Sequence, residues 1–157
     1  MAVFIYAALA AGIFVLDFFL KNHIEQKMGE GEEKSLCGGM LLLRKYHNKG
    51  AFLDIGEKRQ KVVALLSLSL TLFMSVVFLA TFSFRGNAVL KAGLALLLGG
   101  AYSNTYDRLA RKYVVDYISF PVKNRRLRQI AFNISDFCII IGAFLMTLGE
   151  SSKGVRS

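Results

Sequence analysis

The apolar residues of this chain form long blocks instead of alternating with polar residues. A helix needs about 20 mostly apolar residues to cross the hydrocarbon core of a bilayer. Four blocks are of roughly that length, at about residues 3–20, 62–84, 88–106 and 131–148. We therefore predict an all-α integral membrane protein with four transmembrane helices, forming a single membrane domain over residues 1–157.

The segments between the predicted helices are unequal. Residues 21–61 form a long, polar, glycine-rich first loop, and residues 107–130 form a shorter and very basic one, whereas only a tight turn around Gly86 separates the second and third blocks. The short apolar run from Met40 to Leu43 suits either a strand or a position at the membrane interface. An even number of spans puts both termini on one side and both large loops on the other.

Composition supports the membrane interpretation. Hydrophobic residues make up 54% of the chain and the mean hydropathy is +0.45. The net charge is +9, but the basic residues lie between apolar blocks and not along a soluble face, so we predict contact with anionic lipid and no nucleic-acid partner. Cys37 and Cys138 have no metal-ligand spacing, and we expect neither a metal nor another cofactor.

Ionisable residues in apolar spans are costly, so they are candidates for a functional site. Asp17 and Lys21 are four residues apart and share one helix face. Asn104, Asp107 and Arg108 are likewise three and four apart near the end of the third block. Each group also has a structural interpretation, as a helix end for Asp17 with Lys21 and as an interfacial ion pair for Asp107 with Arg108.

Further polar residues accompany the fourth block. Asn133 and Asp136 are three apart at its start, with no basic residue within a turn, and Asp116 lies inside the apolar patch Tyr113 to Val122. In alternating spans, the ends of the first and third blocks and the start of the fourth lie on one membrane face. We therefore expect these groups to meet at one depth, where two carboxyls that share a proton can activate water for peptide hydrolysis.

The order of these residues resembles the lipoprotein signal peptidases, also called signal peptidase II. Residues 99–108, GGAYSNTYDR, are similar to that family's Gly-Gly-Ala-x-x-Asn-x-x-Asp-Arg motif. The segments Val114-Val115-Asp116-Tyr117-Ile118, Phe132-Asn133-Ile134-Ser135-Asp136 and Asn48-Lys49-Gly50-Ala51-Phe52 resemble its Val-Val-Asp-Phe-Ile, Phe-Asn-x-Ala-Asp and Asn-x-Gly-Ala-Ala-Phe. Asp17 and Lys21 match its first-span Asp and Lys, so the resemblance covers nearly the whole chain.

The resemblance implies a function. It identifies an intramembrane aspartyl endopeptidase that removes the signal peptide of prolipoproteins before a diacylglyceryl-modified cysteine, with Asp116 and Asp136 as the catalytic pair. The expected enzyme is a monomer in the bacterial cytoplasmic membrane, with cytoplasmic termini and an active site near the outer face. The residues that would support the pair and the substrate are Asp17, Lys21, Asn48, Gly50, Asn104, Asp107, Arg108 and Asn133.

The chain departs from the family pattern at several points. The first-loop motif is one Ala short, Ser135 replaces the usual Ala and adds a hydroxyl beside Asp136, and there is no Trp. Charge also disagrees with the family's orientation. Residues 21–61 carry nine Lys or Arg and residues 107–130 carry seven, which by the positive-inside rule would place both loops in the cytoplasm. We favour the motif alignment because it uses many ordered residues.

Two other function classes remain open from the sequence. A non-catalytic relative could bind lipid or lipoprotein and use the polar cluster for assembly. A small proton or ion carrier could use buried carboxylates as relays, but it would need acidic residues spread through the membrane depth. The second block contains no acidic residue, and the candidates gather near one face.

Overall fold

The computed structural model describes residues 2–29, 31–50, 59–84, 86–124 and 130–154. Within them, four long helices occupy the four predicted blocks: α1 Ala2–Lys27, α2 Gln60–Ala80, α3 Ala88–Ala110 and α5 Ile134–Gly154. The helix α1 runs seven residues beyond the predicted end at residue 20, so Asp17 lies in its interior and does not terminate it. The helix α5 starts at Ile134, after a short strand that takes up residues 131–132.

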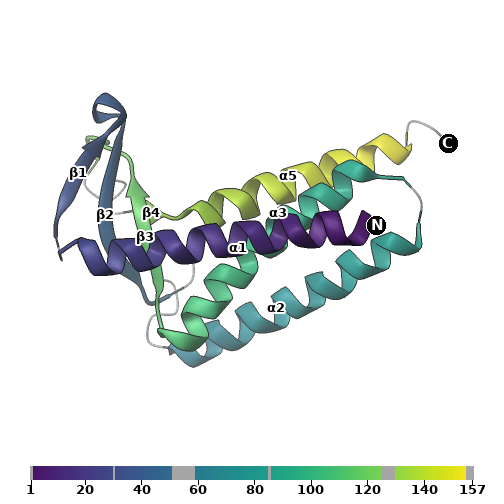
Figure 1. Ribbon diagram of the computed structural model, residues 1–157, viewed down its shortest axis with the longest axis horizontal. Helices are drawn as coiled ribbons and strands as arrows, with labels where there is room; N and C mark the ends of the chain where they lie inside the picture. The colour runs from purple at the N-terminus through teal and green to yellow at the C-terminus, as the bar shows by residue number, and fades with distance from the viewer. Residues whose placement is uncertain (1, 30, 51–58, 85, 125–129, 155–157) are drawn as a thin grey trace.

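The helix α3 is the centre of the bundle, because it packs against each of the other three helices (Figure 1). Glycines allow these close approaches. A Cβ atom on Gly99 would lie 2.7 Å from the Ala10 carbonyl oxygen of α1, and one on Gly93 would lie 2.7 Å from the Gly142 carbonyl oxygen of α5. A Cβ atom on Gly100 would likewise clash with the backbone of Ser135 in α5. Gly99 and Gly100 therefore allow the neighbouring helices to pack closely against α3.

Four strands form an antiparallel sheet in the order β1-β2-β3-β4, with bounds Glu33–Leu36, Leu41–Asn48, Val114–Ser119 and Ala131–Phe132. Most of the apolar run from Met40 to Leu43 thus belongs to β2, which begins at Leu41. Of the two alternatives for this run, the strand is confirmed. The all-α prediction is incomplete, because both large loops and the first two residues of the fourth block build the sheet: β3 lies in the second loop, and β4 is Ala131–Phe132. The strand β4 has only two residues, so it carries little sequence signal before it pairs with β3.

The sheet lies at one end of the bundle, beside the C-terminal ends of α1 and α3 and the start of α5 (Figure 1). The start of α1 and the end of α5 lie together at the opposite end of the bundle. The polar positions of the first, third and fourth blocks therefore converge at the sheet end, as predicted.

Burial in the bundle is inverted relative to a soluble protein. Phe4, Phe73 and Val76 are 78%, 64% and 67% exposed, whereas Asp17 and Lys21 are fully buried. In the described part of the chain, Ala2–Lys27 and Gln60–Ser83 are long and apolar enough to cross a membrane. Such an arrangement is favourable where the surrounding solvent is lipid, since lipid accepts apolar side chains and charged groups must find partners inside the protein.

Candidate active site

The turn after α3 brings Asp116 back over the end of that helix. Lys112 takes a left-handed conformation with φ 72°, and its backbone N–H donates to the Asp107 carbonyl oxygen, which ends the helix. The Asp107 side chain then accepts a bond of 3.2 Å from the backbone N–H of Val115. These bonds fix the start of β3, and Asp116 follows, only 2% exposed.

Asn133 and Asp136 cap the start of α5 reciprocally. The Asn133 Oδ1 accepts a bond of 2.9 Å from the backbone N–H of Asp136, and the Asp136 Oδ2 accepts one of 3.0 Å from the backbone N–H of Asn133. This is a capping box, which satisfies N–H groups that a helix start leaves free. The spacing of three between Asn133 and Asp136 therefore fixes the orientation of the Asp136 carboxyl.

Asp116 is held between two asparagine amides. Asn133 Nδ2 donates to Asp116 Oδ1 at 2.7 Å, and Asn48 Nδ2 donates to Asp116 Oδ2 at 3.0 Å. Asn48 is itself fixed at the end of β2, because its Oδ1 accepts a bond of 3.1 Å from the backbone N–H of Gly50. Burial, together with the neighbouring Asp136, raises the pKa of Asp116 to about 8.

Asp136 is the more accessible member of this pair, being half-buried. Its Oδ1 accepts a bond of 2.8 Å from Asn104 Nδ2 of α3. Asn104 also accepts from Lys21 Nζ at 2.8 Å and from Asn133 Nδ2 at 3.2 Å. Asn133 thus contacts both carboxyls, and Asn104 joins Asp136 to the first helix.

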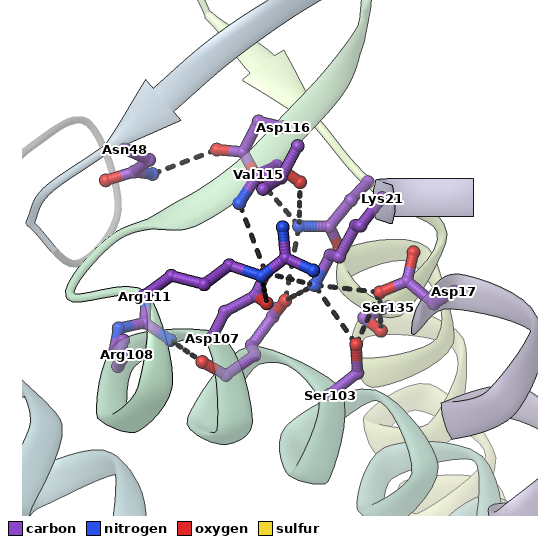
Figure 2. A network of polar contacts seen from close by, with 12 residues as sticks. Asp17, Lys21, Asn48, Ser103, Asp107, Arg108, Arg111, Val115, Asp116 and Ser135 are labelled. Carbon is purple, nitrogen blue, oxygen red and sulfur yellow. Dashed lines mark hydrogen bonds and ion pairs between the residues drawn. The ribbon is translucent and has the colours of Figure 1, made fainter. Parts of the chain in front are cut away.

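A buried ion-pair cluster joins Lys21 to Asp17 and Asp107 (Figure 2). Lys21 Nζ lies 2.8 Å from Asp17 Oδ2 and 3.1 Å from Asp107 Oδ2, and all three side chains are at most 1% exposed. Asp107 Oδ1 also lies 2.9 Å from Arg111 Nε. The predicted pairing of Asp17 with Lys21 is confirmed, while Asp107 pairs with Lys21 and Arg111 and not with Arg108.

Arg108 has backbone partners on two elements. Its Nη1 donates to the Asn104 carbonyl oxygen at 3.3 Å, and its Nη2 donates to the Gly50 carbonyl oxygen at 3.4 Å. Its charge acts on Asp116 and Asp136. The buried Nε has no hydrogen-bond partner within the described ranges. A guanidinium in this position can bind a further acceptor close to the carboxyls.

The charges of the site do not cancel group by group. Asp17 and Asp107 are matched by Lys21 and Arg111, which leaves Arg108 beside the pair formed by Asp116 and Asp136. Lys21 and Arg108 both act on this pair, and two neighbouring carboxyls largely shielded from water favour a state in which the pair holds one proton and carries one negative charge. That state contains one acid and one base, which is what hydrolysis of a peptide by a carboxyl pair requires.

Every residue of the predicted site belongs to this one network. Ala51 and Phe52, the rest of the first-loop motif, lie outside the described residues. The network also contains residues that the sequence analysis did not select, among them Ser103, Arg111 and Tyr117. Arg111 could have been found, because it is four residues from Asp107 on the same helix face. Ser135 was expected beside Asp136, but its hydroxyl is bonded to Asp17.

Comparison with known proteins agrees with this geometry. The family model described as Signal peptidase (SPase) II matches residues 9–150. A lipoprotein signal peptidase from Mesorhizobium japonicum is 31% identical over 92% of this chain and 84% of its own length. One from Caldicellulosiruptor bescii is also 31% identical, over 91% and 88%, and one from Lactiplantibacillus plantarum is 28% identical, over 92% and 93%.

Solved structures show the same fold. A bacterial membrane enzyme solved by the in meso method superposes with a TM-score of 0.80 at 21% identity, covering 97% of this chain and 90% of that one. A second such structure gives a TM-score of 0.75 at 23% identity. The chain therefore belongs to the signal peptidase II family, and its activity is that of a lipoprotein signal peptidase, an aspartic peptidase.

Proposed function

We propose that this enzyme removes the signal peptide of a prolipoprotein by cutting before a diacylglyceryl-modified cysteine, with Asp116 and Asp136 as its catalytic pair. The observation that carries the assignment is that both carboxyls are hydrogen-bonded to the same residue, Asn133. One cation, Arg108, acts on both. Asp17 and Asp107 are less suited to catalysis, because each forms an ion pair with a cation.

The two carboxyls have different roles in this proposal. With a pKa of about 8, Asp116 holds the proton at neutral pH and donates it to the oxygen of the scissile carbonyl. The half-buried Asp136 takes a proton from a water molecule, and the water oxygen attacks the carbonyl carbon. Asp136 then gives that proton to the leaving nitrogen, Asp116 recovers its own from the intermediate, and the C–N bond breaks.

The other polar residues support this chemistry. Asn48, Asn104 and Asn133 orient the two carboxyls through their amide groups. Arg108, with its free Nε, and the neighbouring Gly50 backbone are suited to hold the peptide of the substrate. Lys21 and Asp107 keep α1, α3 and β3 together beneath them.

We also propose that all four helices cross the membrane, with the termini in the cytoplasm and the site near the outer face. The bundle supports an even number of spans, since α1 begins and α5 ends at the end opposite the site (Figure 1). The basic residues near the sheet would then lie against anionic headgroups. A reporter fused to the carboxyl terminus, beside one inserted after Lys123, tests this orientation, and an external carboxyl terminus would overturn it.

The decisive experiment is cleavage of a lipid-modified prolipoprotein by purified protein in liposomes. The parent should cut before the modified cysteine, and Asp116→Asn and Asp136→Asn should each abolish turnover. Glu32→Gln is the matched control, because Glu32 is a surface carboxyl paired with Lys34. If either active-site substitution keeps more than a few per cent of the parent rate while the control is unaffected, the assignment of that residue is wrong. A non-catalytic binder would instead keep its function with Asn at position 136.

A further inference from the structure

Three hydroxyl groups surround the buried carboxylate of Asp17. Ser103 Oγ and Ser135 Oγ donate to its Oδ2 at 2.7 and 2.5 Å, and Tyr117 Oη donates to its Oδ1 at 2.7 Å. Burial and the adjacent Asp17 raise the pKa of Tyr117, so its hydroxyl keeps the proton that it donates. These contacts join α1, α3, β3 and α5 at a single carboxylate.

Two of the three hydroxyls stand at positions where the motif described above has none. The motif has Phe where this chain has Tyr117, and Ala where it has Ser135. The two substitutions are far from each other in local sequence, yet both hydroxyls bind the same side chain. Both residues are themselves buried, Tyr117 at 3% and Ser135 at 0% exposed.

The hydroxyls also contact the turn that carries the catalytic pair. Tyr117 Oη accepts a bond of 3.2 Å from the backbone N–H of Ile134, which is one of the N–H groups that the start of α5 leaves free. Residues 133–136 therefore have two sides. Asn133 and Asp136 face Asp116 and Asn104, whereas the Ile134 N–H and the Ser135 hydroxyl face Tyr117 and Asp17.

Asp17 reaches Asp136 by a second route through the first helix. Lys21 Nζ contacts Asp17 Oδ2 and donates to Asn104 Oδ1, and Asn104 Nδ2 donates to Asp136. A shift of Asp17 would therefore move both the turn of α5 and the amide that holds Asp136. Small displacements of a catalytic group reduce the rate strongly, because the reacting atoms must be aligned.

We propose that Tyr117 and Ser135 are positioning residues, whose hydroxyls hold Asp17 against the first turn of α5 and so fix Asp136 relative to Asp116. The inference rests on the proposed catalytic pair. Neither hydroxyl contacts the two catalytic carboxyls, so the effect is transmitted through Asp17 and the backbone of α5.

Tyr117→Phe and Ser135→Ala test the proposal, because each removes one hydroxyl and restores the residue type of the motif. For Tyr117→Phe we expect kcat to fall about tenfold with KM unchanged, the size of effect that loss of one buried hydrogen bond to a charged group would give. Ser135→Ala should lower kcat about threefold, since Ser103 still donates to the same oxygen. The pH at which kcat falls to half of its maximum, on the alkaline side of the profile, should shift in both variants.

The matched control is Tyr102→Phe. Its hydroxyl makes a bond of equal length, 2.7 Å, to Ser75 Oγ between α2 and α3, away from Asp17. A loss of this bond can lower the thermal midpoint but should leave kcat and the pH profile unchanged. A merely structural role for Tyr117 would make its variant behave like this control.

A double-mutant cycle with Asp17→Asn separates the remaining outcomes. If Tyr117 acts through the Asp17 carboxylate, Tyr117→Phe should change kcat less than twofold in the Asp17→Asn background. The proposal is overturned if Tyr117→Phe keeps kcat within twofold of the parent, or if its full effect persists without the Asp17 carboxylate. Asp116→Asn and Asp136→Asn are measured in parallel. If these are inactive while the hydroxyl variants match the parent, only the positioning role fails, and if they are active, the catalytic pair itself fails.

Discussion

Lys21 lies between two buried carboxylates, and its contacts explain why so polar a cluster is stable inside an apolar bundle. It lies within 3.1 Å of Asp17 and Asp107 and donates to Ser103 and Asn104. A buried ion pair contributes little net stability, because removing the charges from water costs about as much as their attraction returns. Removing one partner of such a pair does lower the stability strongly, since the remaining buried charge then has no partner.

Replacement of this lysine should therefore be strongly destabilising. Lys21→Met keeps the length of the side chain but leaves the Asp17 and Asp107 carboxylates without their shared cation. We expect the free energy of unfolding to fall by about 3–5 kcal/mol. Denaturant titration in detergent measures it. Lys34→Met is the control, because Lys34 is 56% exposed in its pair with Glu32, and such a surface pair contributes little to stability. Equal losses in both variants would contradict the account of the cluster.

The raised pKa of Asp116 predicts a pH dependence of stability. The folded state holds a proton that the unfolded chain, with an ordinary carboxyl pKa near 3.8, releases at lower pH. The stabilisation is present below pH 3.8 and is lost as pH rises towards about 8, because the folded state binds the additional proton. Asp116→Asn removes this titration, so its thermal midpoint should rise relative to the parent between pH 5 and about 8. A constant difference between the two proteins would argue against the shift.

The same carboxyl predicts how activity depends on pH. If Asp116 must donate its proton to the scissile carbonyl, kcat should decline as pH rises through about 8. Initial rates on a lipidated substrate in liposomes, from pH 5 to 9.5, measure this. A rate that keeps rising above pH 9 would show that Asp116 acts as the base and would reverse the proposed roles.

At the scale of elements, glycines on α3 decide how closely the helices approach and hence how the site is assembled. Gly99 faces α1 and the adjacent Gly100 faces α5, so two neighbouring positions bring both partner helices to the end of α3 that carries Asn104 and Asp107. The contact at Gly100 is with Ser135, next to Asp136. Helix packing at Gly100 is therefore linked to the position of the proposed catalytic residue Asp136.

Adding one methyl group to Gly100 should disturb both properties. A Cβ there would meet the Ser135 backbone and lie 3.0 Å from Ile139 Cγ1, so α5 would have to move. Gly100→Ala should lower the free energy of unfolding by about 1–3 kcal/mol and also reduce kcat. Gly12→Ala is the matched helical control, because no atom lies within 4 Å of its Cβ position. It should be neutral or slightly stabilising, by about 1 kcal/mol at most. Similar behaviour of both variants would disprove the packing argument.

At the scale of the whole molecule, the site is complete within one chain. The described groups of the network lie on α1, α3, α5, the sheet and the adjoining turns of the same chain, and the outer faces of α1 and α2 offer apolar side chains suited to lipid. Nothing in the proposed mechanism needs a second copy. We therefore expect the enzyme to act as a monomer.

Mixing two inactive variants tests this expectation. Asp116→Asn and Asp136→Asn, reconstituted together in one liposome population, should show no recovered activity, because each copy lacks one member of its own pair. Light scattering of the detergent complex should give the protein mass of one chain, 17.4 kDa. Recovered turnover in the mixture would show that two copies share a site.

The sequence by itself determined the four helices and the composition of the site. Apolar blocks of membrane length identify helices without knowledge of their neighbours, because a spanning backbone must satisfy its own hydrogen bonds. Ionisable residues inside those blocks, such as Asp17 and Asp136, are costly enough to stand out. Their order along the chain then indicated the family.

Only the tertiary structure decided the sheet and the partners of each polar group. The strand β4 has two residues and β1 is exposed, so both depend on pairing with segments far away in the sequence. Tyr117 and Ser135 are each next to a member of the proposed catalytic pair in the sequence, yet both hydroxyls are bonded to Asp17. Adjacent residues of a strand point to opposite faces, and adjacent residues of a helix lie about 100° apart, so side-chain partners follow from packing and not from proximity in sequence.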